Sequence, residues 1–78
     1  MNNTEIRMPS TGEGTEWIKL KKWNFNNNDF IKKGDTVGEV ETDLAILELE
    51  AFTNGKLEIK KHKGESIEIG DLICIIKP

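Results

Sequence analysis

Apolar and polar residues alternate along much of the second half of the chain. Between residues 45 and 51 the odd positions are apolar, and Glu48 and Glu50 occupy two of the even ones. Residues 56–60 alternate in the same way, and residues 72–76 are apolar throughout. A period of two indicates a strand with one buried face, and a short apolar run indicates a strand buried on both faces. No window shows sustained helical spacing, so the pattern predicts an all-β domain.

Turn residues divide the chain into about eight short extended segments, as in a β-sandwich or flattened barrel. Glycine, proline, asparagine and aspartate cluster between the apolar runs, where they favour turns. The apolar run that ends at Val40 and the one that follows Ala45 are separated by a polar break, which predicts a β-hairpin with its tip at residues 41–45. The expected strands are residues 5–8, 16–25, 30–31, 36–40, 45–51, 56–60, 67–69 and 72–76.

A weak internal repeat relates the two halves of the chain. Residues 28–37 resemble residues 64–73, so that Gly34-Asp35 corresponds to Gly70-Asp71. Two similar halves predict a flattened barrel or sandwich of two sheets, about four strands each, with approximate two-fold symmetry. The hairpin tip is then expected at one end of the molecule and the chain termini at the other.

Composition places the chain among small globular domains. Residues 1–78 are expected to form one domain, with residues 1–4 frayed and residues 77–78 at the start of a linker; the hydrophobic fraction is 36% and the charged fraction 32%. The net charge of -3 argues against nucleic acid as a partner. No apolar run has membrane-spanning length and no signal peptide is visible, which predicts a soluble, intracellular module. Cys74, the one cysteine, has no intrachain disulfide partner.

The residues with catalytic potential are few, and none forms a convincing site. His62 is the one histidine and lies in a lysine-rich turn, whereas Cys74 lies in the most apolar strand and is expected to be an inert buried thiol. Glu41 and Asp43 form a carboxylate pair, but an exposed hairpin tip offers no pocket to perturb either pKa. No spacing indicates a zinc or calcium site. We therefore expect a non-catalytic domain without a metal.

The hairpin tip carries a motif. The stretch Glu41-Thr42-Asp43-Leu44-Ala45 resembles the Glu-Thr-Asp-Lys-Ala tip of the lipoyl domain, the swinging-arm carrier of 2-oxoacid dehydrogenase complexes. Leu44 replaces the lysine to which that family attaches lipoate. The resemblance extends over residues 6–76 and also includes Met8-Pro9, Gly12-Glu13-Gly14, Lys33-Gly34-Asp35 and Gly55.

This resemblance implies a carrier domain of a dihydrolipoamide acyltransferase subunit, monomeric when isolated, in the cytoplasm or the mitochondrial matrix. Its partners are the 2-oxoacid dehydrogenase (E1) and a lipoate ligase or lipoyltransferase. Its cofactor is lipoate, held at position 44 and flanked by Glu41, Thr42, Asp43 and Ala45. By the same resemblance, Gly12, Glu13, Gly14 and Thr15 form a loop that helps partners to recognise the domain. Leu44 has no amine, so lipoylation of this chain is not expected.

Two alternatives remain open from the residues alone. The domain has either been altered at Leu44 or has lost its arm naturally and serves as a docking or regulatory module, in which the acidic tip contacts a partner. The related biotinyl domain has a Met-Lys-Met tip. Neither methionine occurs beside Leu44, at Asp43 or Ala45, so a biotinyl carrier is the weaker interpretation.

Overall fold

The computed structural model describes residues 2–11 and 14–78, which form β-strands, turns and loops. These residues include no helix that is long and apolar enough to cross a membrane. The strands are β1 (Thr4–Arg7), β2 (Ile18–Trp23), β3 (Phe30–Ile31), β4 (Thr36–Thr42), β5 (Ile46–Glu50), β6 (Gly55–Ile59) and β7 (Leu72–Lys77). The prediction of an all-β domain is confirmed.

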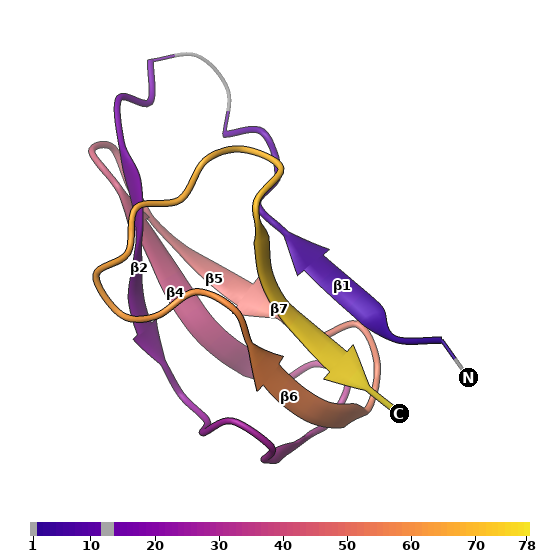
Figure 1. Ribbon diagram of the computed structural model, residues 1–78. Helices are drawn as coiled ribbons and strands as arrows, with labels where there is room; N and C mark the ends of the chain where they lie inside the picture. The colour runs from indigo at the N-terminus through magenta and orange to yellow at the C-terminus, as the bar shows by residue number, and fades with distance from the viewer. Residues whose placement is uncertain (1, 12–13) are drawn as a thin grey trace.

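The strands form two antiparallel sheets that enclose one core. One sheet has four strands in the order β1-β7-β6-β3, and the other has three in the order β2-β4-β5. In Figure 1, β6 and β7 lie in front of β4. The second sheet lacks the expected fourth strand. In the segment at residues 67–69, Ile67 N–H donates to Ile18 C=O at 2.8 Å, and the residues just before it contact β2 through an isolated bridge between Ser66 and Lys19 and a bond from Leu20 N–H to Glu65 C=O at 3.0 Å.

Both sheets contribute apolar side chains to the core. Each fully buried aliphatic side chain contributes roughly 1.5–3 kcal/mol to folding. The core residues are Ile6, Met8, Ile18, Leu20, Ile31, Val37, Val40, Leu49, Ala51, Leu57, Ile67, Ile73, Cys74 and Ile76.

Strand β5 departs from its predicted burial. Leu49 and Ala51 are buried as expected, but Leu47 is 36% exposed and Ala45 is also exposed. The tip of the β4–β5 hairpin projects past the opposite sheet (Figure 1), so the tip-proximal half of β5 has less of the fold packed over it.

Trp23 is partly buried and packs against the core. Its indole Nε1 donates a hydrogen bond to the Lys61 carbonyl at 2.9 Å. The ring also lies against Gly38, where an added Cβ would come within 2.9 Å of the ring and 2.7 Å of the Lys22 carbonyl. Glycine at this position therefore permits a close approach that any side chain would prevent.

Equivalent turns in the two halves bear out the sequence repeat. Gly34 and Gly70 have φ angles of 95° and 91°. The following carboxylates, Asp35 and Asp71, each accept a hydrogen bond from the backbone N–H three residues earlier, at 2.9 and 2.8 Å. A second pair of turns matches in the same way, because Asn28 and Gly64 have φ angles of 73° and 87°. The approximate two-fold relation is thus built into the turns.

Both ends of the chain lie away from the hairpin tip. Thr4 in β1 pairs with Ile76 in β7, and Figure 1 places the two termini at the end of the molecule opposite the β4–β5 tip, as expected. Strand β1 begins at Thr4 and strand β7 ends at Lys77, so the two paired strands reach close to both termini.

Candidate functional site

The Thr42 hydroxyl organises the tip of the β4–β5 hairpin. Its Oγ1 accepts hydrogen bonds from the backbone N–H groups of Leu44 at 3.0 Å and Ala45 at 2.9 Å. The backbone N–H of Thr42 donates to the Ala45 carbonyl at 2.8 Å, which closes the turn. Thr42 is the one buried polar residue of the described chain, with 6% of its surface exposed. The backbone of the tip is therefore held in one conformation from inside the turn.

Asp43 joins the tip to the loop that precedes β2. Its Oδ1 accepts a hydrogen bond from the backbone N–H of Glu16 at 3.0 Å. An added Cβ on Gly14 would lie 3.9 Å from Leu44 Cδ1, so the loop backbone passes beside the leucine. The structure thus brings Gly14 and Glu16 to the tip, whereas Gly12 and Glu13, also predicted for this loop, lie outside the described residues.

Leu44 lies at the end of the hairpin, with 67% of its surface exposed. An exposed leucine forgoes most of the roughly 1.5–3 kcal/mol that burial would supply. Its position is thus set by the turn around Thr42 rather than by packing in the core.

The lysine that strand pairing places beside the tip comes from β2. Lys19 is the cross-strand partner of Glu41. Lys19 Nζ lies 4.9 Å from the centroid of the Trp17 ring, a cation–π arrangement. Lys19 is far from the tip in sequence, so its proximity depends on the pairing of β2 with β4.

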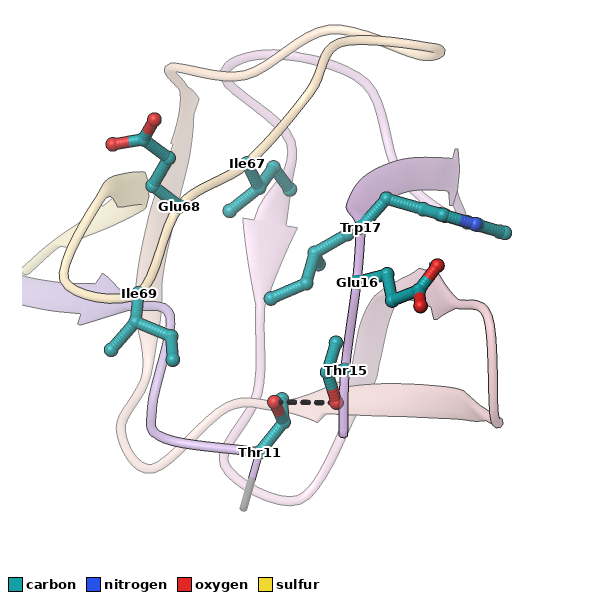
Figure 2. A pocket seen from close by; sticks show the side chains of 8 residues that line it. Thr11, Thr15, Glu16, Trp17, Ile67, Glu68 and Ile69 are labelled. Carbon is teal, nitrogen blue, oxygen red and sulfur yellow. Dashed lines mark hydrogen bonds between the residues drawn. The ribbon is translucent and has the colours of Figure 1, made fainter. Parts of the chain in front are cut away.

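A cleft of about 210 Å³ lies next to the loop at residues 14–16. Figure 2 shows its side chains, with the Thr11 hydroxyl bonded to the Thr15 hydroxyl at 3.0 Å. The Trp17 ring extends away from Ile67 and Ile69 in this view, and 41% of Trp17 is exposed. The lining residues are Thr11, Thr15, Glu16, Trp17, Ile18, Ile67, Glu68 and Ile69.

Other reactive groups lie apart from the tip. Cys74 is buried in β7, and desolvation raises its pKa to about 12, so the nucleophilic thiolate is scarce. His62 is exposed in the turn before residue 65. Within residues 2–11 and 14–78, no group of three or more histidine, cysteine, aspartate or glutamate side chains is arranged to hold a metal ion.

Comparison with known proteins shows similarity to one protein family and to several subunits of dehydrogenase complexes. A family described as "Biotin-requiring enzyme", the biotin/lipoyl group, matches residues 4–76. The acetyltransferase component of the pyruvate dehydrogenase complex from Bacillus subtilis is 33% identical over 70 residues, 88% of this chain and 16% of the relative. The succinyltransferase component of the 2-oxoglutarate dehydrogenase complex from the same organism is 30% identical over 73 residues, 92% of this chain and 18% of the relative.

A third relative belongs to a different kind of subunit. The pyruvate dehydrogenase E1 component subunit beta from Rhizobium meliloti is 40% identical over 53 residues, 68% of this chain and 12% of the relative. The chain thus spans less than a fifth of the length of each of these three relatives. The similarity concerns the domain and not the whole of these proteins.

Proposed function

This chain belongs to the biotin/lipoyl attachment domain family, and we propose that it is a lipoyl-type domain of a 2-oxoacid dehydrogenase acyltransferase component in which Leu44 occupies the attachment position. Lipoyl carrier domains are non-catalytic, and this chain is homologous to them. Because Leu44 has no amine, this chain is not lipoylated. It acts instead as a docking domain that presents the tip to a partner enzyme.

One observation carries this proposal: the tip keeps a preorganised attachment frame around a side chain that cannot be attached. Lipoate is carried as an amide of a lysine ε-amine, and the residues at the tip do not fit that group because Leu44 is a hydrocarbon. The frame itself remains, because Thr42 and Asp43 fix the hairpin and the adjoining loop through hydrogen bonds of 2.9–3.0 Å. The position is also exposed, as a modifying enzyme requires.

Lipoyl rather than biotinyl ancestry is supported by the relatives. Those named above are components of pyruvate and 2-oxoglutarate dehydrogenase complexes. The partners proposed for the chain are therefore an E1 enzyme and, if the amine is restored, a lipoate ligase or lipoyltransferase. Glu41 and Asp43 at the tip, with the loop at residues 12–15, are proposed to guide such a partner by charge.

The direct test restores the amine. The Leu44→Lys variant, incubated with lipoate, ATP and a lipoate ligase, should gain the mass of one lipoyl group by intact mass spectrometry, while the unaltered chain gains none. The Lys19→Arg variant of the unaltered chain serves as a control, because Lys19 is the lysine that β-pairing places nearest to Glu41. Lipoylation of the unaltered chain would contradict the proposal.

The same experiment distinguishes a domain altered only at Leu44 from a docking module that has lost its arm naturally. Quantitative lipoylation of Leu44→Lys would mean that the frame is intact and that Leu44 alone prevents attachment. No lipoylation of a variant that keeps its β-sheet circular dichroism would mean that recognition has changed elsewhere too, which favours a docking module that has lost its arm.

A further inference from the structure

Consecutive apolar residues are exposed along one side of the hairpin. Leu44, Ala45, Ile46 and Leu47 follow one another, and the three larger residues are 67%, 51% and 36% exposed. Consecutive exposed apolar residues are unfavourable in a soluble domain unless they serve a function. The tip frame accounts for the position of Leu44 but gives no reason for Ile46 and Leu47 to be apolar.

These residues lie on an unpaired sheet edge. Strand β5 ends the sheet order β2-β4-β5, so in the described part of the chain no strand lies on its outer side. The bond from Thr42 N–H to Ala45 C=O directs the backbone of Ala45 toward β4. Because hydrogen-bonding direction alternates along an antiparallel strand, the backbone groups of Ile46 and Glu48 point outward. An outward row of this kind is a template for another strand.

Charge is distributed unevenly across this edge. Residues directly opposite each other share a face, so Ile46 lies beside Glu41 and Glu48 beside Glu39 on the outer face of the sheet. Leu47 lies opposite Val40, on the face that meets the core. A strand added beside β5 would therefore meet carboxylates on one face and apolar side chains on the other.

We propose that the outer edge of β5, together with Leu44 and Ala45 just before it, binds an extended segment of a partner protein in which apolar side chains alternate with lysine or arginine. The added strand makes main-chain hydrogen bonds with Ile46 and Glu48, its basic side chains lie near Glu48 and Glu50, and its apolar side chains cover Leu47. This inference goes beyond the docking of the tip and does not depend on an attached group.

A second copy of this chain is a poorer occupant. The chain carries a formal net charge of -3, and pairing two β5 edges would bring both sets of Glu48 and Glu50 together. Like charges across an interface oppose association. A basic strand avoids that repulsion and pairs with the same carboxylates.

The probe is a fluorescein-labelled peptide of alternating valine and lysine, equal in length to β5. Fluorescence anisotropy with the intact chain should rise to saturation, and a valine–glutamate peptide should bind at least about tenfold more weakly because its charges oppose those of the edge. In a parallel NMR experiment, hydrogen exchange at the amides of Ile46 and Glu48 should slow when the valine–lysine peptide is added.

Two variants separate charge from strand pairing. Glu48→Lys combined with Glu50→Lys should reverse the preference between the two peptides, whereas Glu68→Lys, which changes an exposed glutamate outside the edge, should leave it unchanged. Ile46→Pro removes an outward N–H, a change that edge strands tolerate, and should abolish binding of the valine–lysine peptide while the amide spectrum remains folded.

Three results would overturn the proposal. Unchanged peptide affinity of a folded Ile46→Pro variant would mean that charge attraction alone holds the peptide. Equal binding of both peptides would exclude the assigned basic partner. Slow exchange at Ile46 and Glu48 without peptide, increasing with protein concentration, would mean that a second copy occupies the edge.

Discussion

Replacing Thr42 with valine tests whether one hydroxyl holds the tip of the hairpin. Valine has nearly the same shape as threonine, so the substitution removes the oxygen and leaves the β-branched packing in place. It removes the acceptor for the backbone N–H groups of Leu44 and Ala45, which lie 3.0 and 2.9 Å from the oxygen. The change therefore acts on the turn and only slightly on the core.

The size of the effect follows from these contacts. A protein hydrogen bond contributes a net 0.5–1.5 kcal/mol or so, and two accepted bonds are lost, which gives about 1–3 kcal/mol. The added methyl group of valine, at a position that is 6% exposed, returns less than about 1 kcal/mol. We expect the free energy of unfolding to fall by about 1–2 kcal/mol.

Urea unfolding, followed by circular dichroism, measures this difference from the midpoint and slope. Hydrogen exchange at the Leu44 and Ala45 amides should accelerate more than exchange in β7, because the loss is local. Thr42→Ser is the matched control: it keeps the hydroxyl and should retain the slower exchange at both amides. In the Leu44→Lys background, Thr42→Val should also slow lipoylation.

The Thr42 hydroxyl would not hold the tip if Thr42→Val changed the free energy of unfolding by less than about 0.5 kcal/mol and left the exchange of both amides unaltered. The tip would then be held by the Asp43 bond to Glu16 and by cross-strand pairing alone. A loss equal in Thr42→Ser and Thr42→Val would also contradict it, because the hydroxyl would then be irrelevant.

Three other predictions concern the scaffold. Gly55→Ala should lower the free energy of unfolding, measured in urea, by at least about 2 kcal/mol, because the added Cβ would collide with the Lys77 carbonyl oxygen; an unchanged midpoint would contradict this close approach. The ammonium groups of Lys60 and Lys77 lower the pKa of Glu58 from 4.5 to about 2, so its stabilising contribution is present above pH 4.5 and is lost as the pH falls toward 2. Glu58→Gln should therefore flatten acid unfolding in that window, and an unchanged acid profile would exclude this role. Burial raises the pKa of Cys74 to about 12, so alkylation at neutral pH should be much slower in the native chain than in urea, and equal rates would show an open β7.

Most of the architecture was predictable because period-two alternation and turn residues act locally. Residues 34–35 and 70–71 predicted equivalent turns, and the corresponding hydrogen bonds of Asp35 and Asp71 measure 2.9 and 2.8 Å. The segment at residues 67–69 has the apolar spacing of a strand, yet of its residues only Ile67 bonds to the β2 backbone, next to the isolated bridge between Ser66 and Lys19. Alternation of apolar and polar residues indicates which side chains are buried, but it does not indicate whether the backbone pairs with a neighbouring strand. The predicted fourth strand of the second sheet was therefore wrong, and that sheet has three strands.

The sequence indicated which residues form the hairpin, but it did not indicate which distant segments contact them. The flanking strands indicated a hairpin here, and the structure contains it, although β4 continues through Glu41 and Thr42 and the turn lies at residues 43–45. The bond from Glu16 to Asp43 and the neighbourhood of Lys19 and Glu41 join segments far apart in sequence, and such pairs depend on sheet order. The roles of Leu44 and of the loop at residues 12–15 stay predictions.

The pairing of β1 with β7 sets how the domain responds to mechanical force. Thr4 and Ile76 pair antiparallel at the end where both termini emerge, so a pull on the two ends separates the strands one cross-strand pair at a time. Such unzipping breaks hydrogen bonds in succession, whereas shear would load all of them together. The β4–β5 hairpin belongs to the other sheet and lies outside this line of force. A tethered domain of this kind would give way first at the β1–β7 pair, beside its tether.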